Sequence, residues 1–301
     1  MDSSITRSKP SYLGSIAGEL SDRSRRVYES DAAIFAGWLQ ERHITKDSID
    51  RQVVTDYRGW LAEKYKPSTA KRMFSVARRL LDEQVNSGIL TTNYAKGVKG
   101  IKAEDDSPHI ALTKDQANAL LGAIDTSTKK GKRDYAIVLC LLLTGIRRFE
   151  CADLNLGDIG MEQGHHTLSI QGKGNRRETV KLRAEVWRAI GEYLEATGRT
   201  DLTKDRPIFC QFRKGDHPIE EGISSMVIYR IILAYAKNAE IDAHLTPHGM
   251  RASFVTLSLE GGAKLEQVQV AARHRDPRTT ERYWRRRNRL DDNAVDYIRL
   301  N

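Results

Sequence analysis

The 301-residue chain has little cysteine and no long apolar segment, and each shortage excludes a class of protein. Its three cysteines, Cys140, Cys151 and Cys210, are an odd number at no metal-like spacing, which is typical of reduced intracellular thiols. The longest apolar run, Tyr135 to Leu143, has nine residues, whereas a membrane span needs roughly 18 or more. We therefore expect a buried helix there. Because the first residues lack the basic and apolar regions of a signal peptide, we expect a cytoplasmic protein.

Motifs of nucleotide-dependent and metal-dependent enzymes are also lacking. The chain has no GxxxxGK[ST] loop and no carboxylate cluster for two-metal catalysis. His244 and His248 are four residues apart, but Pro247 interrupts the helix that would align them. His165 and His166 are adjacent on an expected strand and would point to opposite faces. We therefore expect no cofactor and no metal.

Charge is plentiful and unevenly distributed. Charged residues make up 30 % of the chain and hydrophobic residues 40 %, which is typical of a globular protein, and the length suggests two domains. The net charge is +9; residues 1–103 hold 18 Lys and Arg against 12 Asp and Glu, and the other 198 residues hold 31 against 28. The basic excess in the N-terminal third favours a polyanionic partner, nucleic acid first and an anionic membrane second.

The N-terminal third has helical periodicity only. We expect a helix from Ser21 onward, a shorter one around 53–61, and a third from Pro67, capped by Ser68 and Thr69, to about Gly88. No strand is expected before residue 105. Candidate phosphate contacts near two helix starts are Arg25, Arg26, Ser68, Thr69, Lys71 and Arg72. A solvated helix face explains the basic residues equally well.

The rest of the chain mixes helices with strands. An acidic, proline-marked stretch predicts a linker at 104–112, and the Thr113 to Gln116 pattern predicts a capped helix. Further expected elements are a buried helix at 134–143, strands at 166–171 and 178–182 joined by a glycine-rich turn, an amphipathic helix at 186–194, a short strand at 207–209, a buried helix at 226–236 and a terminal helix with an apolar stripe.

Charged side chains and one tyrosine stand out within this second part. Arg147 and Glu150 directly follow the core helix; a structural salt bridge is the alternative to a functional role for this pair. Lys173 lies at the tip of the expected hairpin, where most lysines serve only solubility. His248 and Arg251 are three apart and share a helix face. A tyrosine is a poor nucleophile at neutral pH, because its phenol titrates near ~10. Beside cations that also hold a phosphate, it could attack that phosphate and form a covalent ester.

Four motifs in one order resemble those of the tyrosine recombinase (phage integrase-like) family, the bacterial Xer recombinases in particular. They are Thr144-Gly145-Ile146-Arg147-Arg148-Phe149-Glu150 for its TGxRxxE box, Gly172-Lys173-Gly174-Asn175 for its GKGN hairpin, His248-Gly249-Met250-Arg251 for its HxxR box, and His274 with Tyr283 for its closing pair. The resemblance implies a mainly α fold with a small antiparallel sheet. A SAM-like helical core-binding domain would occupy 1–103, and a mixed α/β catalytic domain 113–301.

The resemblance also implies the central chemistry. Tyr283 would attack a DNA phosphorus, giving a 3′-phosphotyrosine and a free 5′-hydroxyl. Arg147 and Arg251 would clamp the non-bridging oxygens, since a guanidinium matches phosphate with paired donors.

Supporting roles follow from the same resemblance. His248 is the candidate to take the phenolic proton, and Lys173 would protonate the departing 5′-oxygen. His274 would hydrogen-bond to the phosphate. Glu150 would fix the conformation of the TGxRxxE motif without contacting the phosphate itself.

Two positions depart from the family pattern. Ala272-Arg273-His274 stands where members usually have Leu-Gly-His, and it puts a bulky cation beside the site. Asn93-Tyr94 stands where an Asn-Pro pair is common. Neither is a catalytic position, so they bear on the subfamily and not on the chemistry.

The implied partners are double-stranded DNA with a specific recombination site and three further copies of the chain, as a homo-tetramer on two sites. No membrane partner is expected, accessory proteins are left open, and the expected location is the bacterial cytoplasm, at the nucleoid. The terminal stripe Val295, Ile298 and Leu300 is the candidate subunit contact. Since no arm-binding domain precedes the first helix, Xer-like resolution is favoured over lambda-type integration, and the biological task among integration, excision and resolution of dimers is left open.

Three alternatives remain open. A type IB topoisomerase-like enzyme would use a similar constellation to relax one duplex, and a catalytically silent regulator would only bind DNA. A metal-dependent nuclease would need divalent ions.

Overall fold

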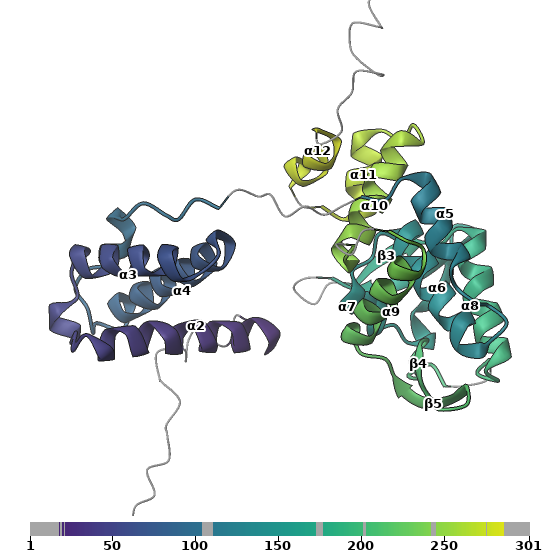
Figure 1. Ribbon diagram of the computed structural model, residues 1–301, viewed down its shortest axis with the longest axis horizontal. Coiled ribbons are helices and arrows are strands. Elements are labelled where there is room, and N and C mark those ends of the chain that lie inside the picture. Colours follow the sequence, from purple (N-terminus) through teal and green to yellow (C-terminus); the bar gives the residue numbers. More distant parts are fainter. Residues whose placement is uncertain are drawn as a thin grey trace, which may run out of the picture. The chain divides into compact units, whose positions relative to one another are not determined.

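The protein is described from a computed structural model that divides into two compact units, residues 1–107 and 108–301. It describes residues 18, 20, 22–103, 111–172, 177–200, 203–241, 245–274 and 276–285, with the side chains of 22, 23 and 282–285 outside the description. Each unit has its own hydrophobic core. Figure 1 shows the elements of both units along the sequence.

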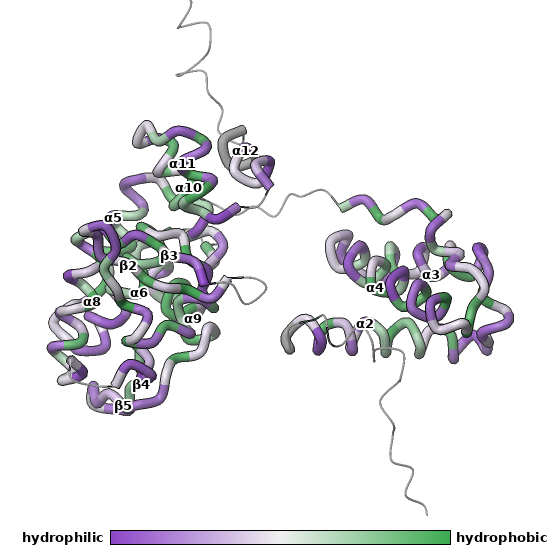
Figure 2. Tube along the Cα trace, turned by 180° about the vertical axis from the view of Figure 1, so that it is seen from behind, coloured by the Kyte–Doolittle hydropathy of each residue, from purple (hydrophilic) through white to green (hydrophobic). Residues whose placement is uncertain are grey.

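The described part of unit 1 contains three helices. They are α2 (Asp22–Glu41), α3 (Arg51–Lys64) and α4 (Pro67–Asn86), with short 3₁₀ turns at Lys46–Ser48 and Tyr94–Gly97. On α4 the expected stripe of Met73, Val76 and Leu80 is buried, and α4 packs against both α2 and α3. Apolar and polar residues alternate around these helices, as Figure 2 shows, so each helix turns one face to a shared core.

The start of α4 differs from the expected cap. The residue before the helix is Lys66, whose side chain makes no capping hydrogen bond. Pro67 occupies the first helical position, where its missing N–H costs nothing. Ser68 and Thr69 therefore lie inside the first turn and do not cap it.

Unit 2 is built around one buried helix, α6. Its helices are α5 (Lys114–Gly122), α6 (Lys129–Thr144), α7 (Arg148–Ala152), α8 (Ala184–Ala196), α9 (Ser225–Asn238), α10 (Pro247–Glu260), α11 (Leu265–Ala272) and α12 (Pro277–Arg285). α6 packs against α8 and α10, and most of its residues are buried. It begins at Lys129, five residues before the expected start. The Asp216 carboxylate accepts from the amides of Lys129 and Lys130 at 2.7 and 2.8 Å and so satisfies the first turn.

Two antiparallel sheets complete the described part of unit 2. β1 (Ile159–Glu162), β2 (His165–Gln171) and β3 (Arg177–Lys181) pair in that order, and β4 (Cys210–Arg213) pairs with β5 (His217–Gly222). The mainly α fold with small antiparallel sheets is therefore confirmed. The short strand expected at 207–209 is wrong: Pro207 forms only an isolated bridge with Asn155, and the strand starts at Cys210. Proline has no N–H to extend a ladder.

Within the described residues, no helix combines the length and the apolar character needed to cross a bilayer.

Candidate active site

The site begins where α6 ends. Gly145 closes α6 in a left-handed conformation (φ 63°), and a Cβ on it would lie 2.4 Å from the Phe254 ring. Glycine therefore allows both the turn and the close approach of α10. The chain then reaches Arg147, which precedes the first residue of α7.

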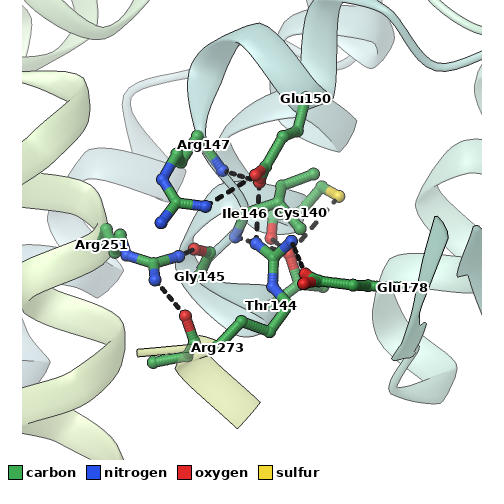
Figure 3. A network of polar contacts seen from close by, with 10 residues as sticks. Cys140, Thr144, Gly145, Ile146, Arg147, Glu150, Glu178, Arg251 and Arg273 are labelled. Carbon is green, nitrogen blue, oxygen red and sulfur yellow. Dashed lines mark hydrogen bonds and ion pairs between the residues drawn. The ribbon is translucent and has the colours of Figure 1, made fainter. Parts of the chain in front are cut away.

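The Glu150 carboxylate holds Arg147 by two contacts. It accepts from the Arg147 backbone N–H at 2.6 Å and from its Nη1 at 2.8 Å (Figure 3). The Glu150 side chain is 8 % exposed, whereas that of Arg147 is 47 % exposed. Burial raises the pKa of Glu150, but hydrogen bonds from Arg273 and Arg147 outweigh it, so that pKa lies below its ordinary value. A buried anion thus fixes an arginine whose guanidinium remains accessible.

Arg251 joins the first box to the end of α11. It lies on α10, is 2 % exposed, and donates from Nη1 to the Gly145 carbonyl and from Nη2 to the Ala272 carbonyl (Figure 3). Both carbonyls end helices and would otherwise need another donor. The HxxR arginine therefore stabilises the site's own framework.

A cavity of about 310 Å³ brings the first and third motifs together. Arg147, His248 and Arg251 line it, and Arg148, Phe149, Tyr229, Thr246 and Pro247 complete its wall. His248 is exposed one residue after the start of α10, and Arg251 is buried one turn later on the same helix. Two guanidinium groups and an imidazole thus border one space of a size that accepts a phosphate.

His274 lies within the field of these cations. Its Nδ1 is 2.8 Å from the Thr280 hydroxyl oxygen on α12, and the two share a hydrogen bond. Burial lowers the pKa of His274 most, and nearby positive charges lower it further, to about 4. The charges are those of the guanidinium groups of Arg251, Arg147 and Arg273. At neutral pH the imidazole is therefore uncharged and able both to donate and to accept.

Two of the expected catalytic residues lie partly or wholly outside the description. Lys173 is in the segment 173–176 between β2 and β3, outside the described residues. Tyr283 lies on α12, which packs against α10 and α11, but its side chain is outside the described part. The structure therefore brings together Arg147, Glu150, His248, Arg251 and His274.

Two further charged residues belong to this network and are not among the expected site residues. The Arg273 side chain, 8 % exposed, donates to Glu150 at 2.7 Å and to Glu178 on β3 at 3.3 Å (Figure 3). The only signal in the sequence is the arginine at a position where the family usually has glycine. Glu178 has no such signal, because its partner is 95 residues away.

The candidate phosphate contacts of unit 1 divide into different environments. Arg26, Ser68 and Lys71 are exposed, and Arg25 and Thr69 are partly buried. Arg72 donates to the carboxylate of Asp31, which is 3 % exposed, so it pairs α4 with α2. Among the described residues, no three His, Cys, Asp or Glu side chains form a group able to hold a metal.

Comparison with known families covers both units. Residues 111–289 match the "Phage integrase family", and residues 12–88 match "Phage integrase, N-terminal SAM-like domain".

Relatives of known name cover most of the chain. Tyrosine recombinase XerD of Pseudomonas putida is 31 % identical over 269 residues, 88 % of this chain and 87 % of that protein. Tyrosine recombinase XerD of Bifidobacterium longum is 31 % identical over 293 residues, 94 % of each chain.

Solved structures share the fold at low identity. XerH site-specific recombinase bound to a palindromic difH substrate, in a post-cleavage complex, has a TM-score of 0.74 at 19 % identity over 90 % of this chain and 78 % of that one. A lambda integrase tetramer bound to a Holliday junction has a TM-score of 0.71 at 16 % identity, over 94 % and 78 %. The chain belongs to the phage integrase family of tyrosine recombinases and is a site-specific DNA recombinase.

Proposed function

We propose that this recombinase cuts and rejoins DNA through a 3′-phosphotyrosine on Tyr283. The supporting observation is the cavity of about 310 Å³ that Arg147, His248 and Arg251 line together. Cleavage of a phosphodiester requires extra negative charge on phosphoryl oxygens to be stabilised, and guanidinium groups preorganised around one space provide this.

In this proposal Arg147 and Arg251 contribute differently to the phosphate clamp. Arg147 is half-exposed and held at its backbone by Glu150, so it can donate directly to a non-bridging oxygen. Arg251 is fixed by two carbonyls and contributes its charge at short range from the cavity wall. Fixed cations need little reorganisation when charge develops, which favours catalysis.

Proton transfers are assigned to three side chains. His248, exposed on the cavity wall, takes the phenolic proton of Tyr283. His274 is neutral at physiological pH, which suits a hydrogen bond to the phosphate without adding a mobile charge. Lys173, at the expected hairpin tip, delivers a proton to the 5′-oxygen that departs.

The position of Tyr283 on α12 supports its role as nucleophile. Residue 283 is three positions after Thr280, so both positions share one face of the helix. Thr280 shares a hydrogen bond with His274, which lies in the field of Arg251 and Arg147. The helix that carries the tyrosine is therefore attached to the cation-rich site.

The proposed partner is double-stranded DNA with a specific site, bound by domains at 1–103 and 113–301 that a linker at 104–112 connects. In unit 1 the exposed start of α4, with Ser68, Thr69 and Lys71, offers amide groups and positive charge to a phosphate. XerH is seen bound to a palindromic difH substrate, and lambda integrase is seen bound to DNA and as a tetramer bound to a Holliday junction. A homo-tetramer on two sites, at the bacterial nucleoid, and a role in dimer resolution or in integration and excision complete the proposal.

A trapping experiment tests the chemistry. A site is selected from a random duplex pool by binding to Tyr283→Phe, and a nicked copy of that duplex is offered to wild type and to Tyr283→Phe. Wild type should accumulate a detergent-resistant complex with a 3′-linked phosphotyrosine and a free 5′-hydroxyl, because the nick lets the leaving strand diffuse away. The variant should bind equally and trap nothing.

Failure of wild type to trap any DNA under these conditions would refute the proposal. Cleavage that a chelator abolishes would instead indicate a metal-dependent nuclease. Relaxation of any supercoiled plasmid, regardless of sequence, would indicate a topoisomerase-like enzyme.

A further inference from the structure

The backbone at Arg273 is one that glycine usually adopts. Arg273 follows the last residue of α11 with left-handed angles (φ 56°, ψ 43°). Its amide and that of His274 donate to the carbonyls of Val270 and Gln269 at 2.9 and 3.0 Å, which closes the helix. A side chain in this conformation is disfavoured relative to glycine. Backbone geometry therefore gives no reason for an arginine here, and the reason must lie in its side chain.

That side chain is buried between two carboxylates. Arg273 is 8 % exposed and donates from Nη2 to Glu150 at 2.7 Å and from Nη1 to Glu178 at 3.3 Å. Its Nε is buried and has no hydrogen-bond partner among the described residues. A guanidinium is costly to bury unless its charge is paired, so the two carboxylates keep it in place. One cation thus joins the end of α11 to α7 and to β3.

The Glu178 contact reaches the base of the β2–β3 connection. A Cβ placed on Gly172 would lie 2.9 Å from Glu178 Cδ and 3.0 Å from its Oε1, so the carboxylate packs directly on this glycine. Lys173 is the next residue in the sequence. Arg273 therefore links the residue before Lys173 to the turn that carries His274.

The Glu150 contact reaches Arg147. Glu150 Oε2 accepts from both the Arg147 amide, at 2.6 Å, and Arg273 Nη2, at 2.7 Å, while Oε1 accepts from Arg147 Nη1. A carboxylate with three donors has little freedom to rotate, so Arg273 restricts the anion that orients Arg147.

We propose that Arg273 is a positioning residue for strand cleavage, an inference that rests on the function proposed above. Through Glu150 it fixes Arg147, through Glu178 it fixes Gly172, and through its own backbone it fixes His274. It acts through these neighbours and does not touch the phosphate.

The test compares two variants that remove the guanidinium in different ways. Arg273→Met removes the charge and keeps a long side chain, whereas Arg273→Gly removes the charge and suits the left-handed turn. On the nicked duplex described above, both should form the covalent complex roughly 10- to 100-fold more slowly than wild type. Affinity for the intact duplex should change by less than about 3-fold, because the lost interaction matters in the transition state and not in binding.

Two further variants separate positioning from general structure. Arg206→Met, which removes an exposed 2.7 Å ion pair with Glu220 in the same unit, should match wild type in rate and affinity. Arg273→Lys should fall between wild type and Arg273→Met, since one ammonium cannot span two carboxylates as a planar guanidinium does.

A double-variant cycle tests the Glu178 link. Glu178→Gln alone should slow formation of the covalent complex. The double variant with Arg273→Met and Glu178→Gln should be no slower than the slower single variant, because both substitutions remove the same Arg273–Glu178 contact. Thermal unfolding of each variant confirms that the chain is folded.

The inference is overturned if Arg273→Gly cleaves at the wild-type rate, if rate and affinity fall equally, or if the Arg273 and Glu178 effects multiply. Each of these results leaves the proposed function intact, because wild type still traps DNA. A wild-type chain that traps none would refute the proposed function itself and this inference with it.

Discussion

At the scale of single residues, the pKa of His274 should produce a measurable dependence of folding stability on pH. Its pKa is lowered to about 4, first by burial and then by the surrounding cations. The unfolded state therefore binds a proton below about pH 6.5 that the folded state refuses until about pH 4. Folding stability from this group is complete above about pH 6.5 and is lost as the pH falls from there to about 4.

His274→Gln should reduce this loss while keeping a side chain that can hydrogen-bond to Thr280. Denaturant unfolding at about pH 7 and about pH 5 should show a smaller drop in stability for the variant than for wild type. Parallel pH curves would mean that neither burial nor the neighbouring cations lower the pKa of His274. Other titrating groups are common to both proteins and cancel in the difference.

The residues expected to carry the chemistry stand out in the sequence because each belongs to a short motif with fixed spacing. Arg147 and Glu150, or His248 and Arg251, are one helical turn apart, and such pairs are visible without a structure. The Arg273 contacts could not be recognised. They join residues 123 and 95 positions apart, and local patterns carry no information about which distant carboxylate a cation meets.

At the scale of elements, Gly145 is where the end of α6 and the side of α10 meet. Gly145→Ala should destabilise the protein by about 2–4 kcal/mol, because it adds a left-handed alanine and overpacks the Phe254 ring. Gly164 is the matched control: it also has a positive φ (77°), but a Cβ placed on it would have no neighbour within 4 Å. Gly164→Ala should cost only about 1 kcal/mol, as measured by urea unfolding. Equal losses would show that crowding at α10 contributes nothing.

Helix α4 separates a candidate DNA contact from a structural ion pair. Lys71 is exposed, so Lys71→Ala should lower DNA affinity and reduce the salt slope by about one, with stability unchanged within about 0.5 kcal/mol. Arg72→Ala should instead destabilise unit 1 by about 1–3 kcal/mol, since it leaves the buried Asp31 without its cation.

A double variant that removes both charges of the Arg72–Asp31 pair provides the control. Asp31→Asn combined with Arg72→Ala should recover part of the stability that Arg72→Ala loses, because no buried carboxylate is then left without its cation. A stable Arg72→Ala variant would show that the pair contributes little.

Elements with strong periodicity could be predicted from the sequence, and short ones could not. The stripe on α4 and the apolar run within α6 extend over several turns, so their helices follow from the pattern. β1 and β4 have four residues each, too few for alternation to be distinctive. The first turn of α6 is capped locally by the Thr128 hydroxyl and also by the Asp216 carboxylate, which lies 87 residues after Lys129 and could not be paired with it from the sequence.

At the scale of the whole molecule, the tail at 291–301 lies outside the described residues but carries an apolar stripe in its sequence. Its deletion should leave the affinity for a single site unchanged and weaken assembly of paired sites, if the stripe contacts a neighbouring subunit. Gel mobility with one-site and two-site DNA measures both steps. Unchanged recombination by the shortened chain would contradict the subunit contact.

The salt dependence of DNA binding and of assembly can be measured in the same gel-mobility assays. If roughly six or more phosphates are contacted, affinity should fall about 10³-fold or more between ~50 and ~200 mM salt. The assembly step should be less sensitive to salt than the binding step, because an apolar contact releases no counterions.

The burial of Arg251 affects which residues would be lost first if a descendant of this protein lost its catalytic activity. Arg251 satisfies two carbonyls, 106 and 21 positions away, so replacing it would weaken the fold whether or not any DNA is ever cut. A descendant that had abandoned catalysis would still be selected to keep this arginine, whereas the exposed His248 would be lost earlier. In related chains that have lost catalysis, an arginine at position 251 therefore indicates only that the chain still folds. A histidine at position 248 is the better indicator that the enzyme is still active.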